Sequence, residues 1–193
     1  MLSKREKIIG TTQPPRCFRH TKPLAIIGML CLALLGTCMA WGMGSRVPIQ
    51  GTQAENFQLT DLKGQTHQLN QYQGKVVLLN FWATWCKPCV TEMPAMQASY
   101  DRLKDQGFVV LAVNELEDLE MVRAHIQEHQ HTFPVLLDVD NEVANLYGVF
   151  GLPVSVFIDP SGVIREYFKG GLLTEEKINL TFQKLQESTE RKF

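Results

Sequence analysis

The feature that most constrains this chain is a run of apolar residues that leads directly into a pair of cysteines. Residues 76–82 have the length and the β-branched and aromatic content of a buried strand. Lys87-Pro88 follows, and proline suits the first turn of a helix because its missing N–H costs nothing there. The sequence therefore predicts a strand, a turn and a helix, with Cys86 and Cys89 at the start of the helix.

Cysteines at a helix start are predicted to be reactive. Unpaired backbone N–H groups and the positive end of the helix dipole favour a thiolate over a thiol, and Lys87 adds a positive charge. The two-residue spacing lets the second thiol, one turn further inward, attack a mixed disulfide formed on the first. We expect Cys86 to be the more exposed, attacking thiol and Cys89 to be the resolving thiol.

The residues around this pair carry a family resemblance. The segment Trp85-Cys86-Lys87-Pro88-Cys89, after a hydrophobic strand, resembles the active site of thioredoxin-fold proteins. Residues 81–86, Phe-Trp-Ala-Thr-Trp-Cys, are similar to the membrane-anchored, extracytoplasmic TlpA/ResA-like branch, of redoxin or AhpC/TSA type. The resemblance covers roughly residues 56–187. It implies a thiol-disulfide oxidoreductase without a cofactor that acts on protein disulfides, the cysteine pairs of apocytochrome c being the family's best-known substrate.

A second motif, Gly151-Leu152-Pro153, lies far downstream. The resemblance implies that Pro153 follows a cis peptide bond beside the disulfide, and that the backbone of Leu152 pairs with an extended substrate peptide. An ordinary turn proline would instead be trans. Together with Trp85, Lys87 and Pro88, these two residues are expected to shape the site.

Glu92 is the third candidate for catalysis. It follows Cys89 by three residues and therefore shares its helical face, so we expect it to be partly buried beside the resolving thiol. Burial raises the pKa of a carboxyl group toward the range in which it exchanges protons with a thiol. Asn80, where thioredoxins usually carry a buried aspartate, cannot do this. The alternative is a solvated acid that interacts with the helix dipole.

The N-terminal part of the chain predicts a membrane anchor. Residues 1–23 carry six basic side chains and one acidic one, a net charge of +5, whereas the remainder has a net charge of -6. Residues 24–44 contain no charged side chain and are long enough to span a bilayer. The charge split places the N-terminus in the cytoplasm. A linker over 45–55 and a thioredoxin-like domain over 56–193 then lie outside it, at the cell membrane or in the periplasm.

Two other interpretations of this segment remain. Residues 38–40, Cys-Met-Ala, loosely resemble the end of a cleaved signal peptide, and Leu35 to Cys38 resembles a lipoprotein box. Three of the five cysteines, Cys17, Cys31 and Cys38, lie in this part of the chain. Only Cys86 and Cys89 lie in the expected domain, so in an oxidising compartment the pair serves chemistry and is not one of several stabilising disulfides.

The remaining pattern predicts an α/β fold. A hairpin is expected over 56–69, strands over 108–113, 135–137, 154–158 and 163–168, and helices over 89–106, 118–129, 141–147 and from Thr174 onward. This order gives a mixed central sheet flanked by helices. It is also the order of the thioredoxin fold, with an N-terminal hairpin and, over 115–147, the inserted strand and helix of the TlpA/ResA-like branch.

The cysteine pair also suits two other functions. Two thiolates could bind copper, and a thiol peroxidase shares the fold, but the cysteine spacing and the lack of a typical Thr-x-x-Cys pattern disfavour both. A net charge of -1 disfavours nucleic-acid binding. An electron donor in the membrane is the expected second partner. We expect a solvated helix start for the acidic cluster Glu115, Glu117, Asp118 and Glu120, and surface positions without metal for His125, His129 and His131.

Overall fold

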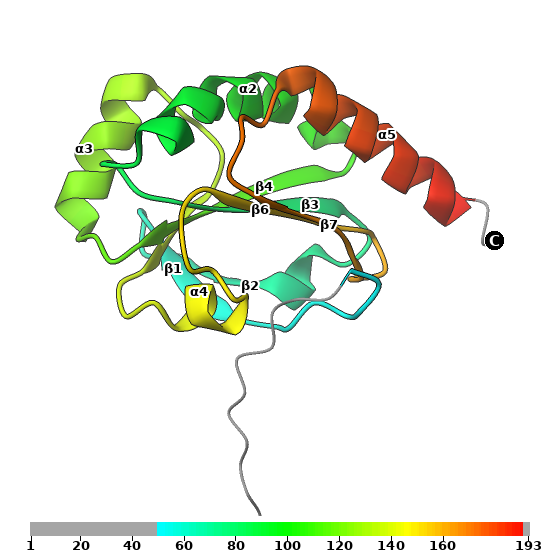
Figure 1. Cartoon of the computed structure of the whole chain (residues 1–193), viewed down its shortest axis with the longest axis horizontal. Coiled ribbons are helices and arrows are strands. Elements are labelled where there is room, and N and C mark those ends of the chain that lie inside the picture. Colours follow the sequence, from blue (N-terminus) through cyan, green and yellow to red (C-terminus); the bar gives the residue numbers. More distant parts are fainter. Residues whose placement is uncertain (1–49, 191–193) are drawn as a thin grey trace, which may run out of the picture. The chain divides into compact units, whose positions relative to one another are not determined.

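The computed structural model describes residues 50–190, and its centre is a seven-stranded mixed sheet in the order β2-β1-β5-β4-β3-β6-β7 (Figure 1). The strands are β1 (Gln58–Asp61), β2 (Thr66–Gln68), β3 (Val76–Trp82), β4 (Phe108–Glu115), β5 (Val135–Asp138), β6 (Val154–Ile158) and β7 (Ile164–Lys169). The helices are α2 (Lys87–Leu103), α3 (Leu119–His129), α4 (Glu142–Leu146) and α5 (Glu175–Glu190), with the 3-10 turns η1 (Leu69–Tyr72) and η2 (Lys104–Gln106).

The strand before the cysteines lies in the interior of the sheet. β3 pairs parallel with β4 on one side and antiparallel with β6 on the other, and all seven of its residues are buried. A strand covered on both faces needs a continuous apolar run instead of an alternating one. Asn80 is the polar exception, and only 1% of its surface is exposed. A buried amide at this place must find its partners inside the protein.

Two hydrophobic layers form on the two faces of the sheet. α2, α3 and α5 cover one face, and α4 lies on the other (Figure 1). Leu78 of β3 faces the first layer, with Met93 of α2 and Phe182 of α5. Leu79, the next residue, faces the second layer, with Tyr147 just after α4. The alternation of side chains along β3 thus fills both layers from one strand.

The expected α/β order and mixed sheet are confirmed. Several element boundaries differ by one to three residues, and two of these differences change the local structure. Leu69 does not end the first hairpin. It begins the turn η1, and its N–H donates to the carbonyl oxygen of Phe57 at 3.3 Å. β4 continues two residues beyond Val113, because Asn114 and Glu115 still pair with β5. The sheet therefore carries polar residues at the carboxyl end of β4, beside the end of β3.

The expected anchor over 24–44 lies outside the described residues. Within residues 50–190, none of the helices has the length and apolar character needed to cross a membrane.

Candidate active site

The two cysteines form a disulfide at the first turn of α2. Cys86 is the N-cap residue, and its sulfur accepts a hydrogen bond from the backbone N–H of Cys89 at 3.3 Å. Pro88 stands in the first helical turn, where no N–H is needed. The same N–H that caps the helix would stabilise negative charge on the Cys86 sulfur after reduction, which favours a thiolate at this atom.

The disulfide is reached from the Trp85 side. Cys86 is 4% exposed and Cys89 is fully buried, whereas the neighbouring Trp85 is 73% exposed. Lys87 and Pro88 are exposed as well. The order of exposure agrees with an outer Cys86 and an inner Cys89.

The loop between α4 and β6 supplies the second part of the site. The Leu152–Pro153 peptide bond is cis, and Pro153 is buried. Leu152 packs against the hydrophobic cluster that contains both cysteines. The Pro153 carbonyl oxygen accepts a hydrogen bond from the Gly170 N–H at 2.9 Å. Leu152 and the two cysteines, which are far apart in the sequence, thus share one hydrophobic cluster.

Glu92 lies inside the protein, on the face of α2 that carries Cys89. It is 2% exposed, so the alternative of a solvated acid is wrong. Its Oε1 accepts a hydrogen bond from Asn80 Nδ2 at 2.8 Å, and its Oε2 accepts one from the Leu173 N–H at 3.1 Å. Burial raises the pKa of Glu92, and the two hydrogen bonds, which favour the charged form, oppose that rise.

The acidic cluster after β4 is buried in part, which corrects the expectation of a solvated helix start. Glu117 is 8% exposed and accepts hydrogen bonds from the backbone N–H of Thr84 at 2.7 Å, from the Thr84 hydroxyl group and from Asn114 Nδ2 at 2.7 Å. Thr84 precedes Cys86 by two residues. Sequence reasoning missed this contact, because no local pattern connects residues 33 positions apart.

The other members of the cluster differ from one another. Asp118 caps α3 by accepting from the Met121 N–H at 3.0 Å, and Glu120 is exposed. Glu115 is 9% exposed, and its Oε1 has no hydrogen-bond partner. Burial, and then the nearby Asp138 carboxyl group, raise the pKa of Glu115 to about 7.

The three histidines are only partly at the surface. Their rings stack in a row, with 4.2 Å between the centroids of His125 and His129 and 6.1 Å between those of His129 and His131. The His125 ring also lies 5.4 Å from that of Trp82, so the fold brings one histidine close to the motif. Burial lowers the pKa of both His125 and His131. No group of three or more potential ligands suited to a metal ion occurs within residues 50–190.

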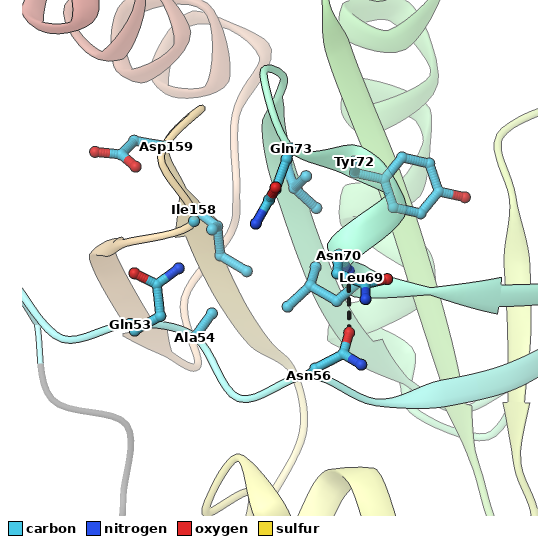
Figure 2. Close-up of a pocket in the computed structure, with 11 residues that line it drawn as sticks. Gln53, Ala54, Asn56, Leu69, Asn70, Tyr72, Gln73, Ile158 and Asp159 are labelled. Atoms are coloured by element: carbon cyan, nitrogen blue, oxygen red, sulfur yellow. Dashed lines mark hydrogen bonds between the residues drawn. The ribbon is translucent and has the colours of Figure 1, made fainter.

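A pocket of about 200 Å³ at the opposite end of β3 contains none of the expected site residues (Figure 2). Val77, at the start of β3, and Ile158, at the end of β6, line it. Two of its polar side chains already have partners. The Asn56 oxygen accepts from the Asn70 N–H at 3.0 Å, and Asp159 accepts from Ser161 and Arg165. Asp159, the acid in this pocket, is therefore already engaged by its neighbours.

The geometry at the start of α2 defines the class of the protein. A cysteine pair that changes between disulfide and dithiol, placed after the central strand of a thioredoxin-like sheet, makes the chain a thiol-disulfide oxidoreductase. The comparisons with known proteins agree with this class. The chain belongs to the AhpC/TSA family, whose model matches residues 50–167.

Individual relatives of this chain are thiol-disulfide oxidoreductases. The chain is 43% identical over 126 residues to the thiol-disulfide oxidoreductase ResA of Geobacillus kaustophilus, covering 65% of this chain and 72% of the relative. It is 39% identical over 153 residues to ResA of Geobacillus thermodenitrificans, covering 78% and 88%. Among solved structures, it matches the thioredoxin domain of a thiol-disulfide oxidoreductase from Bacteroides vulgatus with a TM-score of 0.63 and 28% identity, covering 71% of this chain and 98% of that chain.

Proposed function

We propose that this chain is a membrane-tethered, extracytoplasmic reductase of protein disulfides. Cys86 is its attacking thiol, Cys89 its resolving thiol, and Glu92 the group that handles the proton of Cys89. The observation that carries this proposal is the cap at the start of α2, where the N–H of Cys89 is directed at the Cys86 sulfur. The buried acid on the same helical face supports the role of Glu92.

The reaction runs in two exchange steps. The Cys86 thiolate attacks one sulfur of a substrate disulfide, which forms a mixed disulfide and releases one substrate thiolate. Glu92 then takes the proton of Cys89, and the Cys89 thiolate attacks the Cys86 sulfur and releases the second substrate thiolate. Two electrons pass to the substrate, and the Cys86–Cys89 disulfide remains. A dithiol donor in the membrane then returns the pair to its reduced form.

Exposed apolar side chains support a protein as the substrate. Trp85 is 73% exposed, and Phe150, two residues before Leu152, is 74% exposed. Leu116, beside the Glu117 that contacts Thr84, is 64% exposed. Apolar groups on three segments that meet at the site suit an extended peptide. From the family resemblance, we propose that cysteine pairs of apocytochrome c are among the substrates.

The proposed membrane tether supports electron flow from a membrane donor through the cysteine pair to the substrate. A domain held at the membrane stays near a membrane donor, which serves a reductase better than an oxidant that diffuses freely. The anchor itself is supported by the uncharged residues 24–44 between a basic and an acidic part of the chain. A protease applied to cells with a permeabilised outer layer should degrade residues 46–193. Full protection of this part would overturn the topology.

Trapping in cells tests the chemistry. Cys89→Ala should leave Cys86 linked to natural substrates through mixed disulfides that a reducing gel separates. Cys86→Ala is the matched control and should trap no partner. If the Cys86→Ala variant captured the partners and Cys89→Ala did not, the two roles would be reversed. If the parent pair were wholly oxidised in growing cells without substrate, the direction proposed for electron flow would be wrong.

A further inference from the structure

The Glu92 carboxyl group is held from two sides by elements other than its own helix. Asn80 of β3 donates to Oε1 at 2.8 Å, and the backbone N–H of Leu173, just before α5, donates to Oε2 at 3.1 Å. Each N–H favours the ionised form and offsets part of the cost of burial. The carboxyl group is therefore fixed in orientation and can be ionised where it lies.

Asn80 is itself oriented by Ser155. The two residues are paired across β3 and β6, and Asn80 Nδ2 donates to Ser155 Oγ at 2.9 Å as well as to Glu92. Both N–H groups of the amide are thus used, while Oδ1 is buried without a partner. A buried oxygen without a partner destabilises the fold, and an apolar side chain of the same size would avoid that cost. The cost is consistent with an amide that is kept to direct its N–H groups at Glu92 and Ser155.

Behind Glu92 lies a pocket of about 90 Å³. Ser155, Pro153, Gly170 and Gly171 line it together with Glu92. The two glycines have φ angles of +64° and +80°, and a Cβ built on either would meet no atom within 4 Å, so this wall faces open space. A cavity needs roughly 10–15 Å³ to hold one water molecule, so several fit. The pocket connects the buried carboxyl group with water.

We propose that Asn80 and Ser155 are positioning residues for the Glu92 carboxyl group, and that this group exchanges its proton with water through the pocket it shares with Gly170 and Gly171. The inference rests on the role proposed above for Glu92. When the Cys89 thiolate attacks Cys86, the proton taken from Cys89 sits on Glu92 and then passes to pocket water, which leaves the carboxylate. When a dithiol donor reduces the disulfide, a proton returns to Cys89 by the reverse route.

Few other titratable groups face Glu92. β3 and β6 present Asn80 and Ser155, which do not titrate in the physiological range. On α2 the neighbour on the same face is Cys89. α5 contributes Lys177, which also lines the pocket, but its Nζ lies 3.6 Å from the centroid of the Phe168 ring, and within the described residues it forms no ion pair with Glu92. The state of the carboxyl group is therefore governed by Asn80, the Leu173 N–H and water.

The test compares Asn80→Leu and Ser155→Ala in the full-length chain, purified in detergent. Mixing the reduced protein with dithionitrobenzoate releases one coloured thiolate when Cys86 attacks and a second when Cys89 resolves, so the two steps are timed separately. Carboxyl ¹³C NMR follows the Glu92 titration. Ser99→Ala is the matched control, because it removes a buried hydroxyl group of α2 that has no hydrogen-bond partner.

We expect Asn80→Leu to raise the Glu92 pKa and to slow the second release about tenfold at acidic pH, with little effect at alkaline pH. Ser155→Ala should act in the same direction, less strongly, and Ser99→Ala should match the parent. An unchanged Glu92 titration in both Asn80→Leu and Ser155→Ala would overturn the positioning role. A titration that moves while the rate profile does not would instead contradict the part proposed for Glu92 in the exchange. If Asn80→Leu does not fold, Ser155→Ala alone decides.

Discussion

Glu92 and Glu115 are both buried acids near the carboxyl ends of the central strands, but their surroundings differ. Glu92 lies on α2, on the face of the sheet that carries the cysteines, and two N–H groups hold its oxygens. Glu115 ends β4, and one of its oxygens has no partner. Its closest electrostatic neighbour is another acid, Asp138. Two N–H donors thus hold the Glu92 carboxyl group, whereas the Glu115 carboxyl group lies near a second acid.

Burial raises the pKa of both groups, so a raised pKa alone does not distinguish them. What distinguishes Glu92 is its connection to Cys89 on the same helical face and to a pocket that admits water. Perturbed acids are therefore candidates for function only where geometry links them to reacting atoms. The difference can be tested with matched variants at the two positions.

The largest expected effect is on the chemical step. Glu92→Gln should slow the second thiolate release about 100-fold near neutral pH, because the base that takes the Cys89 proton is lost. Glu92→Gln should also lower the pKa of Cys89 or Cys86 in the reduced protein, since a nearby negative charge is removed. Glu115→Gln should leave both rates within about twofold of the parent. If the second thiolate release were slowed equally in both variants, Glu92 would have no special role compared with Glu115.

The next largest effect is on how the free energy of unfolding depends on pH. The folded-state pKa of Glu115 is raised from 4.5 to about 7, so the folded chain binds this proton more tightly than the unfolded chain. Its contribution is fully present below pH 4.5 and is lost as pH rises through about 7. The free energy of unfolding of Glu115→Gln should therefore exceed that of the parent by about 3 kcal/mol at pH 8 and equal it at pH 4, as measured by urea unfolding. Glu128→Gln, at an exposed site on α3, is the control and should show no such difference.

The smallest expected effect is on the pKa values of the two acids. Asp138→Asn removes the like charge beside Glu115 and should lower the Glu115 pKa, because the ionised form is no longer repelled. The Glu92 pKa should stay where it is, since Asp138 is not among the groups that shift it. Carboxyl ¹³C titrations of the full-length chain measure both. Movement of the two values together would mean that the regions are coupled.

Much of the architecture could be predicted because it is encoded locally. The apolar run of β3 and the proline in the first turn of α2 each act within a few residues, and both form as expected. The burial of Glu92 could also be anticipated from its spacing to Cys89. The partners of Glu92 could not, because Asn80 and Leu173 approach it only after the sheet and α5 are packed.

The acidic residues after β4 show the same limit. A run of acids before a helix indicates a solvated start, and Asp118 fits that pattern. Glu115 does not, because β4 extends two residues further than its apolar run and carries Glu115 into the interior. Glu117 follows β4 and is buried where it accepts hydrogen bonds from Thr84 and Asn114. The pairing of β4 with β5 and the contact with Thr84 both join residues far apart in the sequence, so neither leaves a signal in the local composition.

The contact between Glu117 and Thr84 means that the turn before Cys86 has two supports. One is the covalent connection to β3, and the other is a side chain from the segment that follows β4. The turn that carries Cys86 is therefore connected to two adjacent strands, β3 and β4. Its position thus depends on Glu117 as well as on the cysteine motif. A change in that short segment can misplace the thiol while every residue of the motif is intact.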